Sequence, residues 1–250
     1  MVTIVSELGT CFQPGKPETL GDAAKAALNC GADLVKVQCF EAEGLCRRRG
    51  GLAFRDDLAR WELSFTSLER IFGDDLGKVG VTFFNSYPTW RIQPQLVKKL
   101  AFLKTATQEY QYAKLAQRLS KLASEAGIPM IVSVPRDGCL VVGNYSSVKP
   151  ITWLYSEPVY PAKFSDYQCG QGGRWDRIEG MKRVLPGRFG LSDHTTDQHM
   201  AKFTLHQHPD LDMIEKHFCY DENLRGKTPD SGSWALGCKE FEAFVKEIKR

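Results

Sequence analysis

The segment from Gly190 to Asp230 carries the clearest structural signal in the chain: it reads GLSDHT at 190–195, IEKHF at 214–218 and KTPD at 227–230. The first two motifs each include the end of a short apolar run, and a helix-like stretch separates them. A strand, a helix and a second strand in this order form the unit from which parallel sheets are built. The same unit recurs along the rest of the chain.

Eight short apolar runs predict eight strands, at 2–7, 33–39, 79–84, 101–104, 129–133, 151–155, 187–191 and 211–215. Helices are predicted at 18–30, 59–73, 89–99, 108–126, 174–184, 197–207 and 238–249. Continuous apolar runs suit strands that are covered on both faces, and eight alternations favour closure into a barrel. We therefore expect an α/β fold, a single (β/α)8 TIM barrel domain spanning residues 1–250. Residues 40–58 and 135–150 lack clear periodicity and are predicted to be long loops near the site.

The composition is that of an ordinary globular protein, with 25% charged residues and a net charge of +3. This charge does not form the clustered basic face of a nucleic-acid binder, although Arg47–Arg49 is a local basic run. The sequence shows no signal-peptide pattern and no long apolar stretch, so a cytoplasmic protein without membrane attachment is expected. The eight cysteines are scattered and form no CxxC pair, which favours free thiols.

Polar side chains occur at the end of every predicted strand, where a (β/α)8 barrel carries its active site. They are Glu7, Lys36, Gln38, Asn85, Ser86, Lys104, Thr107, Glu109, Ser133, Arg136, Tyr155, Glu157, Ser192, Asp193, His194, Glu215, Lys216 and His217. The sequence therefore predicts a polar site at this end of the barrel.

Two lysines, Lys36 and Lys104, interrupt apolar strands and are expected inside the barrel mouth. An unpaired ammonium group is costly to bury, and a phosphate or carboxylate group of a ligand would offset that cost. The alternative is a structural ion pair, with Glu7 and Glu109 as competing partners.

Two histidines, His194 and His217, directly follow neighbouring strands. Neutral imidazoles at adjacent strand ends can bind one divalent ion and leave positions open for water and substrate. General acid or base roles without a metal are the alternative. The other three histidines, His199, His206 and His208, are predicted to lie on the surface.

These motifs resemble the sialic acid synthases, a family of (β/α)8 barrels that condense phosphoenolpyruvate with an N-acetylated amino sugar. SDHT and EKHF occur in the family's order and separation, and SELG resembles its N-terminal E-I-G strand. GADLVKVQ resembles the second strand, FLKTATQE the K-x-x-S-x-E strand end, and PMIVS the fifth strand. The resemblance extends from Glu7 to Asp230.

The resemblance implies that His194 and His217 hold Mn²⁺ or Mg²⁺. It further implies that the phosphate and carboxylate of phosphoenolpyruvate are bound by Lys36, Lys104, Thr107, Ser133 and Ser192, with Ser86 as a looser match. Glu7, Gln38, Glu109 and Asp230 would face the acceptor or the attacking water. Glu109 is then the first choice for the base that activates water, and Glu7 the second.

The chain also departs from the family pattern. Thr10-Cys11 replaces an Asn-His pair, Val134-Pro135 follows Ser133 in place of Thr-Gly, and Pro158 replaces an Asn before Tyr160-Pro161. The family's C-terminal antifreeze-like domain, which gives an arginine to a partner's sugar site, has no counterpart in residues 1–250.

These departures favour an aldehyde acceptor other than N-acetylmannosamine. Arg136 or one of Arg47–Arg49 is the candidate replacement for the missing arginine, and a homodimer is expected only by analogy. The alternatives to a phosphoenolpyruvate condensation are a metal-dependent aldolase or isomerase acting on a phosphorylated sugar, and a non-catalytic ligand-binding barrel.

Overall fold

Eight parallel strands close into a barrel in the computed structural model, which describes residues 1–49, 55–109, 111–135, 145, 150–168 and 173–250. The strands pair in chain order, and the last pairs with the first. They are β1 (Thr3–Glu7), β2 (Leu34–Cys39), β3 (Val79–Phe83), β4 (Phe102–Thr105), β5 (Met130–Val134), β6 (Ile151–Ser156), β7 (Arg188–Asp193) and β8 (Met213–His217). Every predicted strand and the (β/α)8 fold are confirmed.

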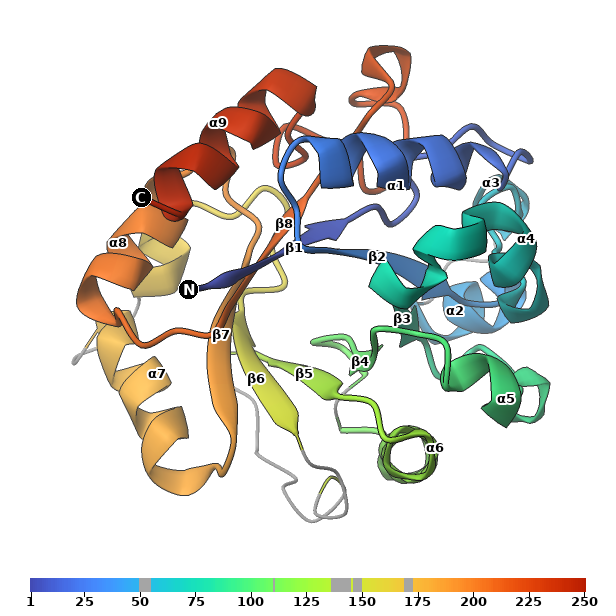
Figure 1. Cartoon of the computed structure of the whole chain (residues 1–250), viewed down its shortest axis with the longest axis horizontal. Coiled ribbons are helices and arrows are strands. Elements are labelled where there is room, and N and C mark those ends of the chain that lie inside the picture. Colours follow the sequence, from blue (N-terminus) through green and yellow to red (C-terminus); the bar gives the residue numbers. More distant parts are fainter. Residues whose placement is uncertain (50–54, 110, 136–144, 146–149, 169–172) are drawn as a thin grey trace.

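Helices surround the strands on the outside of the barrel (Figure 1). Among the described residues they are α1 (Thr19–Asn29), α2 (Ala42–Arg49), α3 (Arg55–Ala59), α4 (Leu68–Phe72), α5 (Pro94–Val97), α6 (Ala113–Ala126), α7 (Gly173–Val184), α8 (His199–Gln207) and α9 (Cys238–Ile248). The predictions for α1, α7, α8 and α9 are confirmed. α6 starts at Ala113 rather than at 108, and it ends at the expected stop, where Gly127 adopts a left-handed conformation with φ of 70°.

The single helix predicted at 59–73 is wrong. α3 ends at Ala59 and α4 begins at Leu68. Between them the side chains of Trp61, Leu63 and Phe65 are buried and the intervening residues are exposed. Burial of every second residue is the pattern of an extended chain, so the apolar residues that suggested a helix have a period of two here.

The helix predicted at 89–99 is also wrong, because proline interrupts it. Gln93 adopts an extended conformation, with φ of −86° and ψ of 117°, directly before Pro94. A residue that precedes proline is sterically driven out of the helical region. The segment therefore divides into a 3₁₀ turn at Thr89–Arg91 and the short helix α5.

The two predicted long loops have different outcomes. Residues 40–58 contain α2 and α3, so the loop prediction is wrong there. Most of 135–150 lies outside the described residues, and so do Arg136, Cys139 and Cys169. The other six cysteines are free thiols.

An apolar layer fills the inside of the barrel on the amino-terminal side of the polar residues. It consists of Val5, Phe102, Ile131, Leu154 and Met213, which lie on five different strands. Gly80 is required beside the Phe102 ring, because an added Cβ would lie 2.0 Å from Cζ of that ring. On four of these strands the residue two positions further along is one of the predicted strand-end polar residues: Glu7, Lys104, Ser133 and Glu215. Residues two apart on a strand point to the same side, so these polar side chains form the next layer towards the carboxyl ends of the strands.

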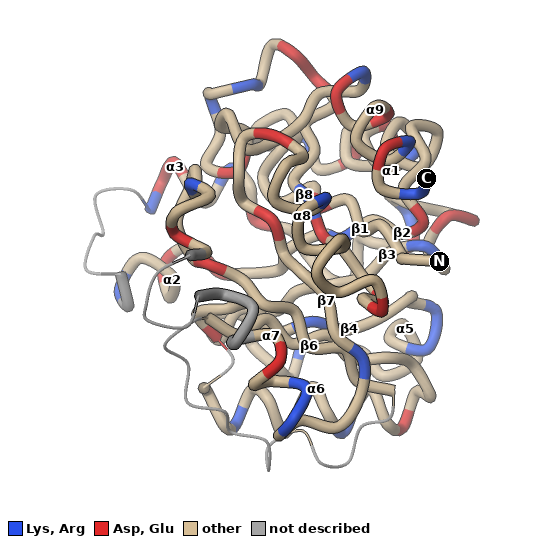
Figure 2. Tube along the Cα trace, turned by 90° about the vertical axis from the view of Figure 1, so that its left-hand side faces the viewer, with Lys and Arg blue, Asp and Glu red and all other residues tan. Residues whose placement is uncertain are grey.

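The outer surface carries charges of both signs, which are interspersed over the helices and loops seen in Figure 2. The buried face of α6 includes the predicted stripe Leu115, Leu119 and Leu122. None of the helices in the described part of the chain is long and apolar enough to cross a membrane.

Candidate active site

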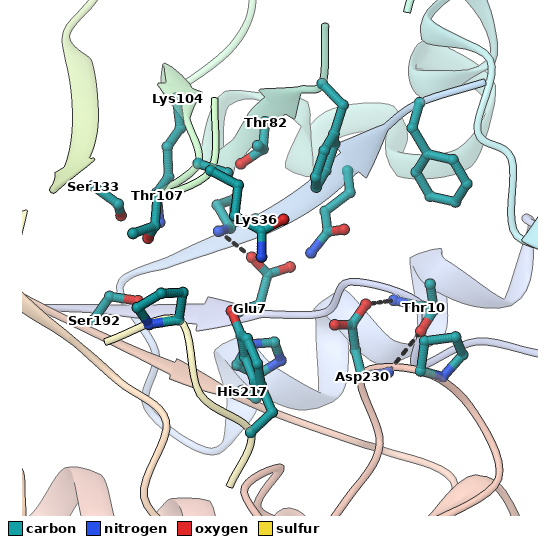
Figure 3. A pocket seen from close by; sticks show the side chains of 18 of the residues that line it. Glu7, Thr10, Lys36, Thr82, Lys104, Thr107, Ser133, Ser192, His217 and Asp230 are labelled. Atoms are coloured by element: carbon teal, nitrogen blue, oxygen red, sulfur yellow. Dashed lines mark hydrogen bonds and ion pairs between the residues drawn. The ribbon is translucent and has the colours of Figure 1, made fainter. Parts of the chain in front are cut away.

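A cavity of about 240 Å³ lies at the carboxyl end of the barrel strands. Ten of the predicted site residues line it: Glu7, Lys36, Gln38, Lys104, Thr107, Ser133, Ser192, His194, His217 and Asp230. Figure 3 shows Lys104, Thr107 and Ser133 together on one side and His217 and Asp230 on the opposite side, with Lys36 and Glu7 between them. The structure therefore brings residues from widely separated strands to one site.

Strand register explains the convergence. Glu7 on β1 is paired with Lys36 on β2 and with His217 on β8. Residues paired across parallel strands point to the same side of the sheet, and residues two apart on one strand do so as well. Glu215 therefore points into the barrel with His217.

Four buried charges form the floor of the cavity. Lys36 forms ion pairs with Glu7 and with Glu215, the latter with 3.1 Å between Nζ and Oε2. Lys104 Nζ donates a hydrogen bond to Glu215 Oε1 at 2.5 Å. All four residues are at most 4% exposed. Both lysines thus have carboxylate partners, and the shared partner is Glu215 rather than Glu109.

Burial and charge pairing shift the pKa values of this group in different directions. Burial raises the pKa of Glu7 to about 7, against the opposing effect of Lys36. Burial lowers the pKa of Lys104 to about 7, although Glu215 opposes the shift. Burial would raise the pKa of Glu215, but Lys104 and Lys36 outweigh it and hold that pKa well below its usual value. Glu7 and Lys104 consequently change protonation near neutral pH.

The two histidines lie side by side, with 5.4 Å between ring centroids. His194 Nδ1 lies 2.7 Å from the carbonyl oxygen of Glu157, which can only accept, so the neutral ring carries its proton on Nδ1 and a lone pair on Nε2. Burial lowers the pKa of His194 to about 3. Burial and the neighbouring His194 also hold the pKa of His217 well below its usual value. Both rings are therefore neutral at pH 7.

Neutral, buried imidazoles on adjacent strands fit the nitrogen ligands of a divalent ion. Within the described ranges no three His, Cys, Asp or Glu side chains are grouped to hold a metal. A metal bound by His194 and His217 would thus need further oxygen ligands from water or substrate. The Tyr160 ring packs on His194, with 4.2 Å between centroids, and covers one face of this pair.

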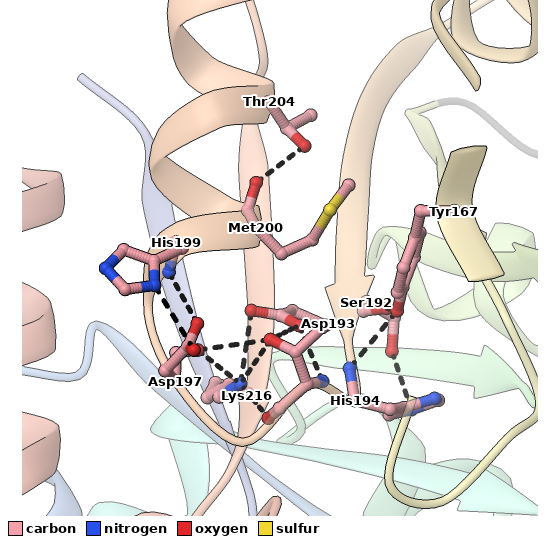
Figure 4. A network of polar contacts seen from close by, with 10 residues as sticks. Tyr167, Ser192, Asp193, His194, Asp197, His199, Met200, Thr204 and Lys216 are labelled. Carbon is pink, nitrogen blue, oxygen red and sulfur yellow. Dashed lines mark hydrogen bonds and ion pairs between the residues drawn. The ribbon is translucent and has the colours of Figure 1, made fainter. Parts of the chain in front are cut away.

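A buried lysine on the outer face of strand β8, Lys216, holds the segment around His194 in place (Figure 4). Lys216 Nζ donates hydrogen bonds to the carbonyl oxygens of Thr195 at 2.5 Å and Asp197 at 3.0 Å, and pairs with Asp193 at 3.1 Å. Asp193 in turn accepts a hydrogen bond from the backbone N–H of Thr195. The strand-end residues Asp193 and Lys216 therefore support the site without lining it.

Asp230 is fixed at the mouth of the cavity by two reciprocal hydrogen bonds with Thr10, each 2.9 Å long. The Thr10 backbone N–H donates to Asp230 Oδ2, and the Asp230 backbone N–H donates to Thr10 Oγ1. Gly9 permits this approach, because its φ is 48° and an added Cβ would lie 2.4 Å from Asp230 Oδ2. The same loop reaches the floor, since the Gly9 N–H donates to Glu7 Oε1.

Two predicted site residues are not part of the cavity wall. Glu109 is buried, and its Oε2 accepts a hydrogen bond from the backbone of Asn85. Ser86 Oγ accepts one from the backbone of Glu41. Ser86 thus links the segments after β2 and β3, and Glu109 links those after β3 and β4.

Several cavity residues were given no role in the sequence prediction, among them Glu215, Thr82 and Tyr160. Glu215 was in the strand-end set, and its spacing of two residues from His217 could have placed it inside the barrel. Of the three histidines predicted on the surface, His199 and His206 are exposed. The prediction for His208 is wrong, because it is buried and contacts Glu179 at 3.1 Å.

A sequence profile of the NeuB family matches residues 23–250. The chain belongs to the NeuB family. This confirms the resemblance that the motifs indicated. One curated relative, an uncharacterized protein of Methanocaldococcus jannaschii, is 23% identical over 235 residues. The match covers 91% of this chain and 64% of that relative, so the NeuB-family chain spans less than two thirds of the relative's length.

Solved structures share the fold. The N-acetylneuraminic acid (sialic acid) synthetase of Leptospira borgpetersenii, in complex with citrate, superimposes with a TM-score of 0.79 at 19% identity, over 100% of this chain and 83% of that one. A spore coat polysaccharide biosynthesis protein of Bacillus subtilis has a TM-score of 0.68 at 21% identity, over 99% and 67%. A truncated 3-deoxy-D-arabino-heptulosonate 7-phosphate synthase of Thermotoga maritima has a TM-score of 0.60 at 12% identity, over 99% and 85%.

Proposed function

We propose that this NeuB-family protein condenses phosphoenolpyruvate with an aldehyde sugar or a related aldehyde, giving a 2-keto acid and inorganic phosphate. The observation that carries the proposal is a single cavity with two buried lysines in its floor and two neutral histidines in its wall. Membership of the NeuB family and the fold shared with two synthases support it.

Phosphoenolpyruvate would bind on the lysine side. Lys36 and Lys104 supply positive charge, and Thr107 and Ser133 supply hydroxyl groups beside Lys104. Ser192 adds a third hydroxyl group, which donates a hydrogen bond to Glu215. The hydroxyl of Ser133 has no hydrogen-bond partner among the described residues, so it is available to a ligand. Ammonium groups fixed in a buried site stabilise charge that moves during a reaction more strongly than they would in water.

In the condensation, C3 of phosphoenolpyruvate forms a bond to the aldehyde carbon of the acceptor, and the aldehyde oxygen takes up a proton to become a hydroxyl group. Water then adds to C2 and loses a proton. The bond between C2 and the phosphate oxygen breaks, phosphate leaves, and the new C2 hydroxyl group loses its proton to become the keto group. We assign the base that takes the proton of the attacking water to Glu7, because it lines the cavity and has a pKa near neutrality. Asp230, held by Thr10, lies at the mouth to face the acceptor's hydroxyl groups.

A divalent metal fits the neutral rings of His194 and His217. When bound, Mn²⁺ or Mg²⁺ would supply a Lewis acid for the carbonyl group of the acceptor. The chain's own part is to keep both imidazoles unprotonated through burial. The hydrogen bond from His194 Nδ1 to the carbonyl oxygen of Glu157 fixes the tautomer that leaves the Nε2 lone pair for a metal.

The proposal is tested by incubating the protein with MnCl₂, phosphoenolpyruvate and a panel of aldoses and N-acetylated hexosamines, and by measuring phosphate release. We expect release that depends on the aldehyde and is lost on chelation. The Lys104→Met variant should bind phosphoenolpyruvate weakly and release little phosphate. Turnover of a phosphorylated sugar without any aldehyde-dependent phosphate release would contradict the proposal and favour an aldolase or isomerase.

A further inference from the structure

Two buried cysteines, Cys11 and Cys219, lie together in the segments that follow β1 and β8. With Ala235 they form a small buried cluster, against which Leu224 packs. Their thiols interact with each other, and Cys219 Sγ also donates a hydrogen bond to the carbonyl oxygen of Asp221 at 3.5 Å. A single buried cysteine acts as a small apolar side chain, whereas two neighbouring thiols form a dithiol that can be oxidised to a disulfide.

A second cavity, of about 80 Å³, reaches this pair. It is lined by Cys11 and by Tyr220 and Asp221, the two residues that follow Cys219. The volume admits an oxidant only slightly larger than water, such as hydrogen peroxide. Neither cysteine lines the larger cavity of the candidate active site, so the pair is a separate feature of the molecule.

The pair adjoins the mouth of the candidate active site. Thr10, which directly precedes Cys11, exchanges two hydrogen bonds with Asp230 (Figure 3). His217, which lines the same cavity, lies two residues before Cys219. A covalent bond between the two sulfur atoms would therefore form within two residues of side chains that line the site.

Cys219 is the more firmly held of the two cysteines. Its backbone N–H donates to the carbonyl oxygen of Leu236 at 3.0 Å, and the Leu236 N–H donates to that of His217 at 3.0 Å. Cys11 ends a short turn, which is closed by the hydrogen bond from its N–H to the carbonyl oxygen of Leu8 at 2.7 Å. A disulfide brings its sulfur atoms to about 2.0 Å, closer than any non-bonded contact. The turn that ends at Cys11 should therefore move when the bond forms.

We propose that Cys11 and Cys219 form an oxidation site, which hydrogen peroxide converts into a disulfide, and that this disulfide weakens the hold of Thr10 on Asp230. This inference goes beyond the proposed function and does not depend on it. In reducing compartments, disulfides are usually transient and serve catalysis or redox sensing.

The oxidation proceeds in two balanced steps. One sulfur attacks an oxygen atom of the peroxide and loses its proton, the O–O bond breaks, and a sulfenic acid and one water molecule form. The other sulfur then displaces the hydroxyl group of the sulfenic acid, which leaves with the proton of the second thiol as another water molecule. The two thiols thus lose two protons and two electrons, and the peroxide gains both. A thiol reductant reverses the reaction.

Mass spectrometry tests for the disulfide directly. The reduced, metal-free protein is treated with hydrogen peroxide, the remaining thiols are blocked with N-ethylmaleimide, and the protein is digested with trypsin. We expect a cross-linked peptide pair that contains Cys11 and Cys219, lacks two hydrogen atoms and disappears on reduction with dithiothreitol. Cys39, which is buried without a neighbouring thiol among the described residues, should remain a thiol.

The matched control is Cys30 with Cys238, a second pair of interacting thiols, at the end of α1 and the start of α9. Cys11→Ala and Cys219→Ala should each abolish the cross-link. The double variant Cys30→Ser/Cys238→Ser should form it to the wild-type extent. Peroxide-treated wild-type protein without a link between Cys11 and Cys219 would overturn the inference, whether these residues remain thiols or become sulfinic acids.

Hydrogen exchange tests the effect of the disulfide on the mouth. The backbone N–H groups of Thr10 and Asp230 donate the two hydrogen bonds, so both should exchange faster in the oxidised protein. Exchange within α6 should not change. Equal exchange at Thr10 and Asp230 in the reduced and cross-linked proteins would overturn the effect on the mouth. Both measurements are made without substrate, so the failure of the proposed condensation would be seen only in the phosphate-release assay.

Discussion

Lys104 places a titrating charge in the floor of the cavity, where the proposed function places the anionic substrate. Burial lowers its pKa to about 7, and burial raises the pKa of Glu7 to about the same value. Below pH 7 Lys104 is charged and Glu7 is protonated, so the site is at its most positive. Above pH 7 the lysine loses its proton and Glu7 becomes ionised, and both changes weaken anion binding.

We therefore expect the affinity for phosphoenolpyruvate to fall as the pH rises from 6 to 8.5, by about tenfold per pH unit where one proton is coupled to binding. Calorimetric titrations across this range measure the slope. Lys104→Met should bind weakly throughout and show a shallower slope, because only Glu7 and the ligand still titrate. Equal slopes for the two proteins would exclude Lys104 as the source.

At this scale the sequence predicted the residues that break a local pattern. Lys36 and Lys104 stand out because each is a charged residue within an otherwise apolar strand. His217 stands out because it directly follows an apolar strand. Thr82 is an ordinary strand residue, and only the closed barrel shows that its hydroxyl is unpaired among the described residues. The position of Glu109 after a strand does not reveal that its carboxylate accepts a hydrogen bond from the backbone N–H of Asn85.

Between elements, Lys216 on β8 ties down the segment that follows β7. Its ammonium group is fully buried and has Asp193 and two backbone carbonyl groups as partners. Lys216→Met would leave the Asp193 carboxylate buried without its cation, and breaking a buried pair in this way costs about 3–5 kcal/mol. Urea unfolding of the metal-free protein measures the loss.

The matched control is Lys202→Met on α8. Lys202 pairs with Glu247 on α9, but both side chains are partly exposed, so the expected loss is under about 1 kcal/mol. Similar losses in the two variants would show that burial does not set the strength of the Lys216 pair.

Sequence pattern predicted long helices well and short ones poorly. The sequence predicts α6 well because the spacing of its leucines indicates the buried face and Gly127 indicates the end of the helix. The segment from Trp61 to Phe65 buries apolar side chains that do not have helical spacing. Its extended conformation depends on contacts with distant parts of the chain, such as the hydrogen bond from Trp61 Nε1 to the carbonyl oxygen of Phe12. Those contacts belong to the tertiary structure.

For the whole molecule, the packing of the apolar layer sets the stability of the barrel. Gly80→Ala would force a Cβ into the space of the Phe102 ring, and overpacking of this kind costs about 1–3 kcal/mol. Thermal or urea unfolding should show the loss. Adding Phe102→Leu, which makes room, should recover part of it; a double variant less stable than the sum of the single changes would contradict this account.

The fold as a whole was predictable because eight repeats of one unit leave few arrangements open to the chain. A parallel strand that is covered on both faces needs a neighbour on each side, and closure supplies one to every strand. The meeting of Glu7, Lys36 and His217 follows from that closure. The reciprocal hydrogen bonds between Thr10 and Asp230 do not, because they depend on how two loops fold over the mouth.

The apolar layer of Val5, Phe102, Ile131, Leu154 and Met213 has a kinetic consequence, because it leaves the carboxyl end of the barrel as the way in and out. The lysines lie just above this layer, whereas Asp230 lies in the loops at the mouth. An acceptor seated at Asp230 would stand in the path of a phosphoenolpyruvate molecule still outside. Under the proposed function, the two substrates should therefore bind in a compulsory order, phosphoenolpyruvate first and the aldehyde second, because the bound acceptor would close the entrance to the cavity.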